Sequence, residues 1–443
     1  MKRIIIFAAA ILFTLGTSAQ NKEKWSLEKC INHALENNIQ IKQKVVNTKY
    51  GENQLQQSKS NRLPSLSANM GQSMNFGRSL QYDNTYQNIN SSNSYVSVDA
   101  NVTLYQGSQL KNTIAQRDFE LKASLEDLHK AKNDITVLVG AGFLEIMLAQ
   151  ELVRVAENQI KITEQQIDRT DQLVKAGSVE QGKLLELQAQ YAQEELRIVE
   201  ATNRLQIALL DLAQLLDVEN VNAFDIEMPT LPELSASPQV HKADDIYSQA
   251  VQNRPEIRLA EYNLKSKEME LKVAKGSLYP TLGLGASYNN NYNNKYKNQN
   301  GTISFSDQLK NNERKSIGLR LSIPIFNKFQ NKTRINNAQL QVADYQLQLE
   351  NQKLKLRKDI ETAYTKAFAA LKRYIANQSA VASLQEAFRY MQEKYDLGVV
   401  TTVEFNEAKN NLTKSQSDLL QAKYEFIFRS KILDFYNGVP ISL

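Results

Sequence analysis

The residues that most often carry chemistry are few and scattered in this sequence. Its histidines are His33, His129 and His241, and its single cysteine is Cys30. None lies at a spacing typical of a metal site, and the sequence has no phosphate-binding glycine loop or nucleophile elbow. We therefore predict no enzymatic activity, no cofactor and no bound metal. Cys30 is expected to be a buried apolar side chain, and His129, on a charge-rich helix, to face solvent.

The N-terminus has the pattern of a secretory signal peptide. Lys2 and Arg3 precede an apolar run at 4–15, and small residues follow it up to Ala19. The run is too short to remain as a membrane-spanning helix. Cleavage after Ala19 would lower the net charge from +5 to about +3, and so modest a charge predicts no nucleic-acid partner. No later run of eighteen apolar residues exists, so we predict no transmembrane helix.

The rest of the sequence is a tandem repeat. Ala34–Ile41 aligns with Ala250–Ile257 at an offset of 216 residues, and Val102–Tyr105 aligns with Ile323–Phe326 at an offset of 221. The offset grows because one loop is longer in the second copy. Between the copies, three prolines prevent a continuous helix. The predicted domains are a signal peptide at 1–19, a first repeat at 20–216, a linker at 217–242 and a second repeat at 243–443.

Each repeat has the same order of predicted elements. A helix comes first, at about 27–61 and 243–278, and a proline marks the entrance to the strands. Two strands follow, joined by long loops rich in Asn and Tyr at 77–94 and 289–315. A very long helix, a glycine turn and a returning helix complete the repeat.

The predicted strands have one apolar and one polar face. In the second strand of the first repeat, the apolar residues are Val96, Val98, Ala100, Val102 and Leu104, and the polar ones are Ser97, Asp99, Asn101 and Thr103. The second copy alternates in the same way from Ile317 to Ile325. Such alternation over about ten residues fits a tilted membrane strand or a strand of a soluble sandwich. Four strands cannot close a barrel alone, so we predict a membrane barrel shared between subunits.

The helices that follow each hairpin carry apolar residues at a spacing of about 3.5, which is typical of coiled coils. The apolar seam runs from Ala149 to Val174 in the first repeat and from Ala370 to Tyr395 in the second. The first outgoing helix, at about 108–175, would be on the order of 100 Å long. The helices alone also fit a coiled-coil spacer, but their combination with hairpins and a signal peptide favours a conduit.

The whole mature chain resembles the TolC family of outer-membrane efflux proteins. The resemblance rests on the order and spacing of three segments, Ser26–Asn38, the strand end Ile323–Phe326 and the turn Leu397–Phe405. It implies a mainly α fold with a membrane β-barrel, in which three chains form a twelve-stranded barrel and a periplasmic α-helical tunnel. It also implies a place in the outer membrane, helices that extend into the periplasm, and a periplasmic adaptor and an inner-membrane pump as partners.

The resemblance assigns a role to the two helical turns. They match the periplasmic tips that the adaptor grips, and a glycine in each permits the left-handed conformation that ends the outgoing helix. The matching residues are Gly177, Ser178, Val179, Gly398, Val399 and Val400.

The resemblance also implies a constriction at the second turn. Glu404 and Glu407 match acidic residues that form a ring in the family, and they share one helix face. The alternative is that both are solvated residues beside a coiled coil. In the family, a tyrosine matching Tyr395 is tied to an arginine and an aspartate, but here these positions hold Val400 and Lys183. We expect Lys183 to pair with Glu404 or Glu407 instead.

Together these features predict a channel in contact with outer-membrane lipid that passively exports substrates delivered by a pump and an adaptor. The main alternative is a surface or structural coiled-coil protein that anchors a partner and has no pore. The sequence does not indicate the cargo.

Overall fold

The computed structural model describes residues 23–80, 84–231, 242–298 and 301–442. The predicted signal peptide and His241 lie outside the described residues. The chain divides into two compact units, one of Met1–Lys42, Ala131–Ala250 and Arg357–Leu443 and one of Gln43–Lys130 and Val251–Leu356. We call them the helical unit and the sheet unit.

Two uninterrupted helices contribute residues to both units. They are α3 (Gln109–Lys175) and α8 (Gln330–Asp396), each 67 residues long. At 1.5 Å per residue each spans about 100 Å. The predicted outgoing helix of the first repeat is therefore confirmed to within a residue.

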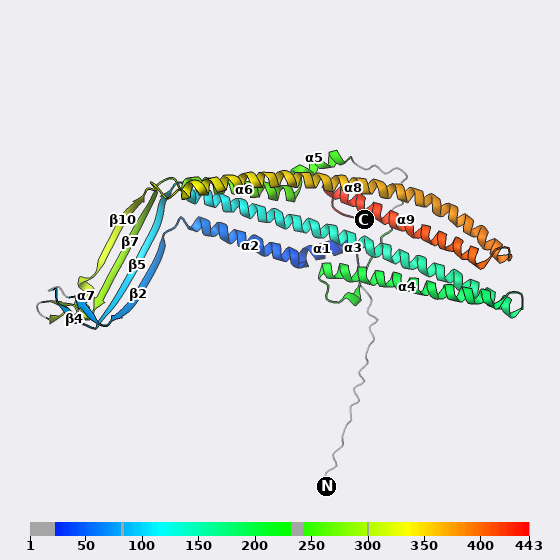
Figure 1. Cartoon of the computed structure of the whole chain (residues 1–443), viewed down its shortest axis with the longest axis horizontal. Helices are drawn as coiled ribbons and strands as arrows, with labels where there is room; N and C mark the ends of the chain where they lie inside the picture. The colour runs from blue at the N-terminus through cyan, green and yellow to red at the C-terminus, as the bar shows by residue number, and fades with distance from the viewer. Residues whose placement is uncertain (1–22, 81–83, 232–241, 299–300, 443) are drawn as a thin grey trace, which may run out of the picture. The chain divides into compact units, whose positions relative to one another are not determined.

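The sheet unit is built on four antiparallel strands, labelled in Figure 1. Their order is β10 (Arg314–Ser322), β7 (Thr281–Asn293), β5 (Ser91–Gln106) and β2 (Ser65–Asn75). The hairpin β2–β5 belongs to the first repeat and β7–β10 to the second, and β5 pairs with β7. The two repeats therefore meet edge to edge in one sheet.

The connections within the hairpins are more ordered than predicted. The first contains the small hairpin β3 (Arg78–Leu80) and β4 (Tyr86–Asn88), and the second contains β8 (Lys297–Asn298), β9 (Gly301–Thr302) and α7 (Phe305–Asn311). The buried Gln308 amide holds α7 in place, because it donates to the Asn293 and Ile303 carbonyls and accepts from the Asn293 N–H. The two predicted loops therefore contain short elements that the sequence did not predict.

The helix predicted at the start of each repeat is broken into two. The first copy has α1 (Leu27–Asn37) and α2 (Ile39–Ser60), and the second has α5 (Ala243–Asn253) and α6 (Pro255–Gly276). At the first break, the Asn38 side chain accepts from Gln40 N–H and donates to the Leu215 carbonyl. At the second, Pro255 has no backbone donor and begins a new helix at its first position.

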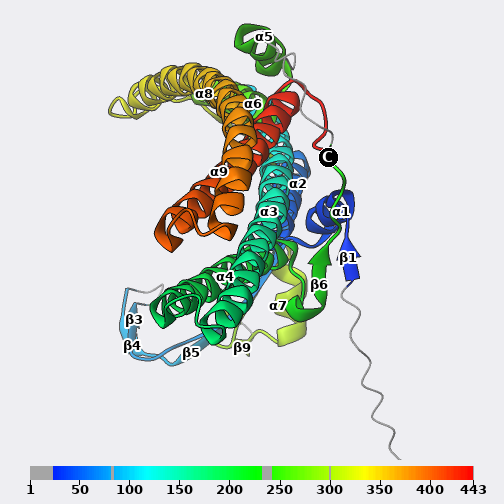
Figure 2. The ribbon, with the colours of Figure 1, turned by 90° about the vertical axis from the view of Figure 1, so that its right-hand side faces the viewer.

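The helical unit contains two antiparallel helix pairs, visible in Figures 1 and 2. The second part of α3 pairs with α4 (Gln181–Leu216), and the second part of α8 pairs with α9 (Thr402–Tyr436). The predicted seams face inward: Ala149, Thr163 and Thr170 on α3 and Ala370 and Phe388 on α8 are buried, and the other seam residues of these two helices are half-buried. The coiled-coil prediction is thus confirmed.

One stretch of α3 is apolar enough to cross a membrane by composition alone. An 18-residue window reaches a mean hydropathy of 1.6, but half of it is buried within the structure. Phe143, Ile146 and Met147 are fully buried there. The stretch therefore forms part of the helical unit's core.

The same unit contains a small parallel sheet that the sequence did not predict. Strand β1 (Glu23–Trp25) pairs with β6 (Phe224–Ile226), which follows the 3-10 turn η1 (Val221–Ala223). The Trp25 ring packs edge-on against Phe224. The predicted linker at 217–242 is therefore partly structured, because Phe224 and Ile226 are buried apolar side chains.

Candidate functional site

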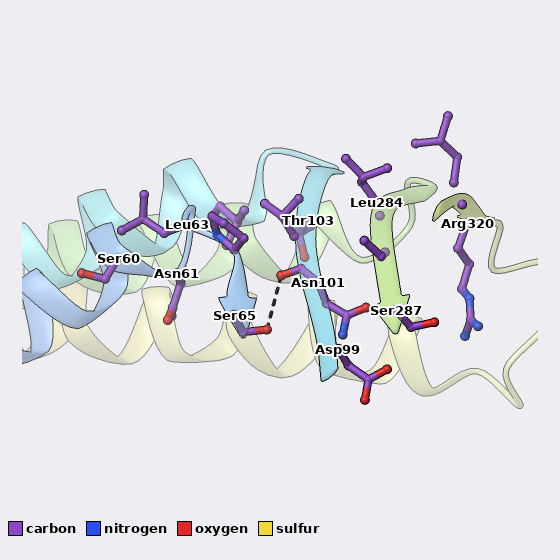
Figure 3. A pocket seen from close by; sticks show the side chains of 18 of the residues that line it. Ser60, Asn61, Leu63, Ser65, Asp99, Asn101, Thr103, Leu284, Ser287 and Arg320 are labelled. Carbon is purple, nitrogen blue, oxygen red and sulfur yellow. Dashed lines mark hydrogen bonds between the residues drawn. The ribbon is translucent and has the colours of Figure 1, made fainter. Parts of the chain in front are cut away.

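The register of the four strands separates polar from apolar side chains completely at the centre of the sheet. One row across the sheet is Leu66, Ala100, Ala286 and Ile317, and the next is Ser67, Asp99, Ser287 and Ser316. In Figure 3, Asp99, Ser287 and Arg320 point to one side of the sheet and Leu284 to the other. The predicted two-faced strands are confirmed.

The apolar face is uncovered along its outer strands. Leu66 is 75% exposed and Ile317 is 77% exposed. Other exposed members are Met70, Leu319 and Leu321. A continuous apolar face of this extent marks a surface that contacts lipid or protein.

The polar face contains a hollow of about 910 Å³, shown in Figure 3. Gly283, Gly285 and Gly318 form part of its lining, so the backbone is open to it, and Asp99 and Arg320 supply charges. A polar surface with small side chains suits a wet channel wall.

Both helical turns of the helical unit end their outgoing helix in the same way. Gly177 has a φ of 73° and Gly398 a φ of 72°. In each turn the glycine N–H donates to the backbone carbonyl three residues earlier. The N–H of the next residue donates to the carbonyl five residues before it, and these distances are 2.9 to 3.0 Å. This is the Schellman pattern, and it confirms the predicted left-handed glycines.

The returning helices begin differently. At the second turn, Thr401 and Glu404 form a capping box, in which the Thr401 N–H donates to Glu404 Oε2 at 2.8 Å. At the first turn, Glu180 caps α4 without a side-chain bond, and Lys183 stands where Glu404 stands in the other copy. The bonds from Thr401, first from its backbone N–H and then from its hydroxyl, lower the pKa of Glu404.

The remaining candidates at the second turn are only partly brought together. Tyr395 stacks on Phe405 at 4.6 Å between ring centroids. Glu407 is exposed, as is Lys183. Among the described residues Lys183 forms no ion pair with either glutamate, so that pairing stays a prediction.

A second link lies beside Tyr395. Arg169 of α3 forms an ion pair with the carboxylate of Asp396 and donates to the Asp396 carbonyl oxygen at 2.9 Å. It joins the two outgoing helices near their ends. Sequence reasoning missed this link because both residues resemble ordinary exposed charges of a coiled coil.

The helical unit also contains a buried ion pair that sequence reasoning missed. Lys409 Nζ lies 2.6 Å from Glu194 Oε1, and the two side chains are 2% and 1% exposed. Thr163 Oγ1 accepts from the lysine at 2.5 Å and donates to Glu194 Oε2, and Gln159 donates to Glu194 Oε1 at 3.2 Å. Burial lowers the pKa of Lys409, and the Glu194 carboxylate opposes that change.

The cysteine and the two histidines that the structure describes are Cys30, His33 and His129. Cys30 is fully buried, as predicted, and burial raises the pKa of its thiol to about 12. His129 is exposed, as predicted, and His33 packs edge-on against Trp25. Within the described ranges no group of three His, Cys, Asp or Glu side chains is placed to hold a metal ion.

A sheet with an uncovered apolar face, joined to long helical hairpins, is the arrangement expected of an outer-membrane channel subunit. The model of the outer membrane efflux protein family matches residues 30–217 and 246–434. The chain belongs to this family.

Individual relatives are distant but extensive. The outer membrane efflux protein BepC of Brucella suis is 23% identical over 344 residues, which cover 76% of this chain and 70% of the relative. The proteases secretion protein PrtF of Dickeya chrysanthemi is 20% identical over 447 residues, which cover 96% and 90%.

Solved structures share the fold. CusC superposes with a TM-score of 0.79 at 18% identity, covering 93% of this chain and 92% of that one. The outer membrane protein VceC of Vibrio cholerae gives a TM-score of 0.77 at 14% identity, covering 94% and 97%.

The predicted export channel of the outer membrane is confirmed by family membership, which does not favour the alternative of an anchor protein without a pore. Members of the family are channels, and they work with an adaptor and an inner-membrane pump.

Proposed function

We propose that three copies of this chain close one twelve-stranded barrel and a helical tunnel, which together conduct cargo passively. The sheet carries this proposal. Its outer strands β2 and β10 have no second partner strand among the described residues. An open edge in lipid leaves backbone donors and acceptors unsatisfied. Pairing of β2 with β10 of the next copy satisfies both edges.

Exposed apolar stripes on the helices support contacts between copies. On α8, Leu340, Leu347 and Leu354 recur every seven residues and are 64 to 69% exposed. A seven-residue interval keeps side chains on one side of a coiled coil. A second exposed stripe on α4 consists of Leu185, Leu196, Val199, Ile207 and Leu210.

Disulfide trapping tests the closed barrel. In a Cys30→Ala background, Ser67→Cys on β2 is combined with a cysteine at each residue of β10 in turn. At least one combination should give covalent trimers upon oxidation. The matched control combines Ser67→Cys with Ser287→Cys on the central strand β7, which should not link chains. Absence of any link between chains across the whole β10 series would refute the shared barrel.

The two helical turns are the proposed docking site of the adaptor. The second turn presents Leu397, Val399 and Val403 to solvent, and Val399 is 69% exposed. The first turn exposes fewer large apolar side chains, since Gly177 and Ser178 are exposed and Val179 is half-buried. Exposed apolar side chains at a helix end suit a partner that covers them.

Photo-crosslinking tests the docking site. A photoreactive residue at Val179 or Val399 should capture the adaptor in intact cells, and the same residue at the exposed Val46 of α2 should not. Failure of both turn positions, with a folded trimer, would contradict docking there.

The gate is proposed to lie at the helical turns, with Tyr395, Glu404 and Glu407 of the second turn and Lys183 of the first. Three copies of each glutamate would line a cation-attracting entrance. Lys183→Glu should raise single-channel conductance, because it adds repulsion where we propose an attractive link. An unchanged and mostly closed channel would count against that link.

The cargo depends on the partners. PrtF is named for secretion of proteases and CusC for cation efflux. We propose that this chain receives its cargo from a dedicated pump.

A further inference from the structure

We propose that Arg314 and Arg320 of β10 make the lumen of the barrel attract anionic solutes. The inference rests on the proposed function, because the polar face must line the lumen of a closed barrel. It concerns the barrel and is independent of the acidic residues at the helical turns.

The register places both arginines on the polar face. Arg314 pairs with Asn289 and Arg320 with Gly283, at positions that alternate with Ile317 and Leu319 on the apolar face. Neither guanidinium forms an ion pair within the described ranges. Both charges are therefore available to a solute.

The charges of the polar face do not balance. Besides the two arginines, the polar rows of β2, β5, β7 and β10 contain a single residue that is charged at neutral pH, Asp99. Asp99 accepts a hydrogen bond from Ser97 Oγ at 3.1 Å. Each chain thus adds one net positive charge to the lumen, and three chains triple it. Rings of arginine favour anions in pores.

The glycines beside Arg320 leave room for a solute. Gly283 and Gly285 of β7 and Gly318 of β10 line the same hollow as Arg320. Gly318 has no atom within 4 Å of where a Cβ would stand. The guanidinium therefore borders open space where a solute can reach it.

Thiol modification measures the potential in the lumen without requiring an open gate. Ser316→Cys, in a Cys30→Ala background, places a reporter on the polar face between the two arginines. The cysteine thiol is allowed to react with two methanethiosulfonate reagents in isolated outer membranes, one bearing a sulfonate and one bearing a trimethylammonium group. The rates of the two reactions are compared. Arg314→Gln with Arg320→Gln should lower the sulfonate-to-ammonium rate ratio about fourfold, for charges roughly 7 and 13 Å away at about 0.1 M salt. Asp99→Asn should raise it.

Matched variants separate the possible outcomes. Lys315→Gln removes a cation from the opposite face of the same strand, where Lys315 pairs with Glu313, and should leave the ratio unchanged. Arg→Lys at both positions should also preserve it. An unchanged ratio in the double Gln variant overturns the inference. If Ile317→Cys on the apolar face reacts as fast as Ser316→Cys, the barrel assignment itself fails.

Discussion

Lys409 and Glu194 bring two opposite charges into the interior of the helical unit, where Thr163 and Gln159 complete their hydrogen bonds. The pair joins α9 to α4, and Thr163 adds α3. Buried ion pairs contribute little net stability, but in some proteins they fix which partners and which register are allowed. We interpret this pair as the contact that sets the register between the hairpins of the two repeats.

The pair predicts an asymmetry between single and double substitutions. Lys409→Met alone leaves the Glu194 carboxylate buried without a cation and should cost about 3 to 5 kcal/mol. Lys409→Met combined with Glu194→Leu should recover most of that loss. Thermal unfolding of the detergent-solubilised protein, followed by circular dichroism, measures both. A single variant as stable as the parent would show that the charges are not buried together.

The capping box predicts a pH dependence. The pKa of Glu404 is lower in the folded protein than its ordinary value of 4.5, so its carboxylate stabilises α9 above that pH. The contribution is lost as pH falls through the lowered pKa. The stability difference between the parent and Glu404→Ala should therefore be present at pH 7 and shrink in strong acid. A difference that stays constant over that range would contradict the bond.

At the two helical turns, the outgoing helices end in the same way but the returning helices begin differently. Both outgoing helices end on a left-handed glycine, but only α9 starts with a side-chain cap. Because Lys183 occupies the position of Glu404, α4 cannot form the same capping box. The first turn is thus the less firmly held of the two.

Glycine substitutions test the turns. Gly177→Ala should destabilise the protein by about 1 to 2 kcal/mol, because a Cβ disfavours the left-handed conformation. Gly182, one turn away in α4, also has open space around it but no positive φ. Gly182→Ala should therefore be neutral or slightly stabilising. Equal effects of both substitutions on thermal unfolding would exclude a conformational role for Gly177.

The sequence predicted the long elements well, because their signals are local and repeated. Alternation from Val96 to Leu104 and the seam from Ala149 to Val174 each extend over many residues. The breaks at Asn38 and Pro255 and the helix α7 each depend on single residues, which periodicity does not register. Strand β6 was missed for a related reason, since three residues are too few for a pattern.

The candidate site was predictable only where it follows backbone geometry. Gly177 and Gly398 were found because a left-handed helix end favours glycine. Lys409 was not found, because a lysine beside a seam is normally solvated, and its partner is 215 residues away. To predict that Glu404 caps a helix, one must know where α9 begins.

For the whole molecule, one sheet with two open edges, one apolar face and one polar face accounts for both the membrane location and the pore. The chain alone has too few strands to enclose a lumen. We therefore propose that function belongs to the assembled copies, and that the duplicated hairpin gives each copy four of the strands.

The conductance of the purified protein in a planar lipid bilayer tests this account most directly. We predict discrete current steps of uniform size, carried by a species whose mass is that of three chains. Variants that place arginine at Leu319, on the apolar face, should prevent insertion, whereas arginine at Ser316 should not. Stable insertion without any current steps, or steps from a single chain, would contradict the account.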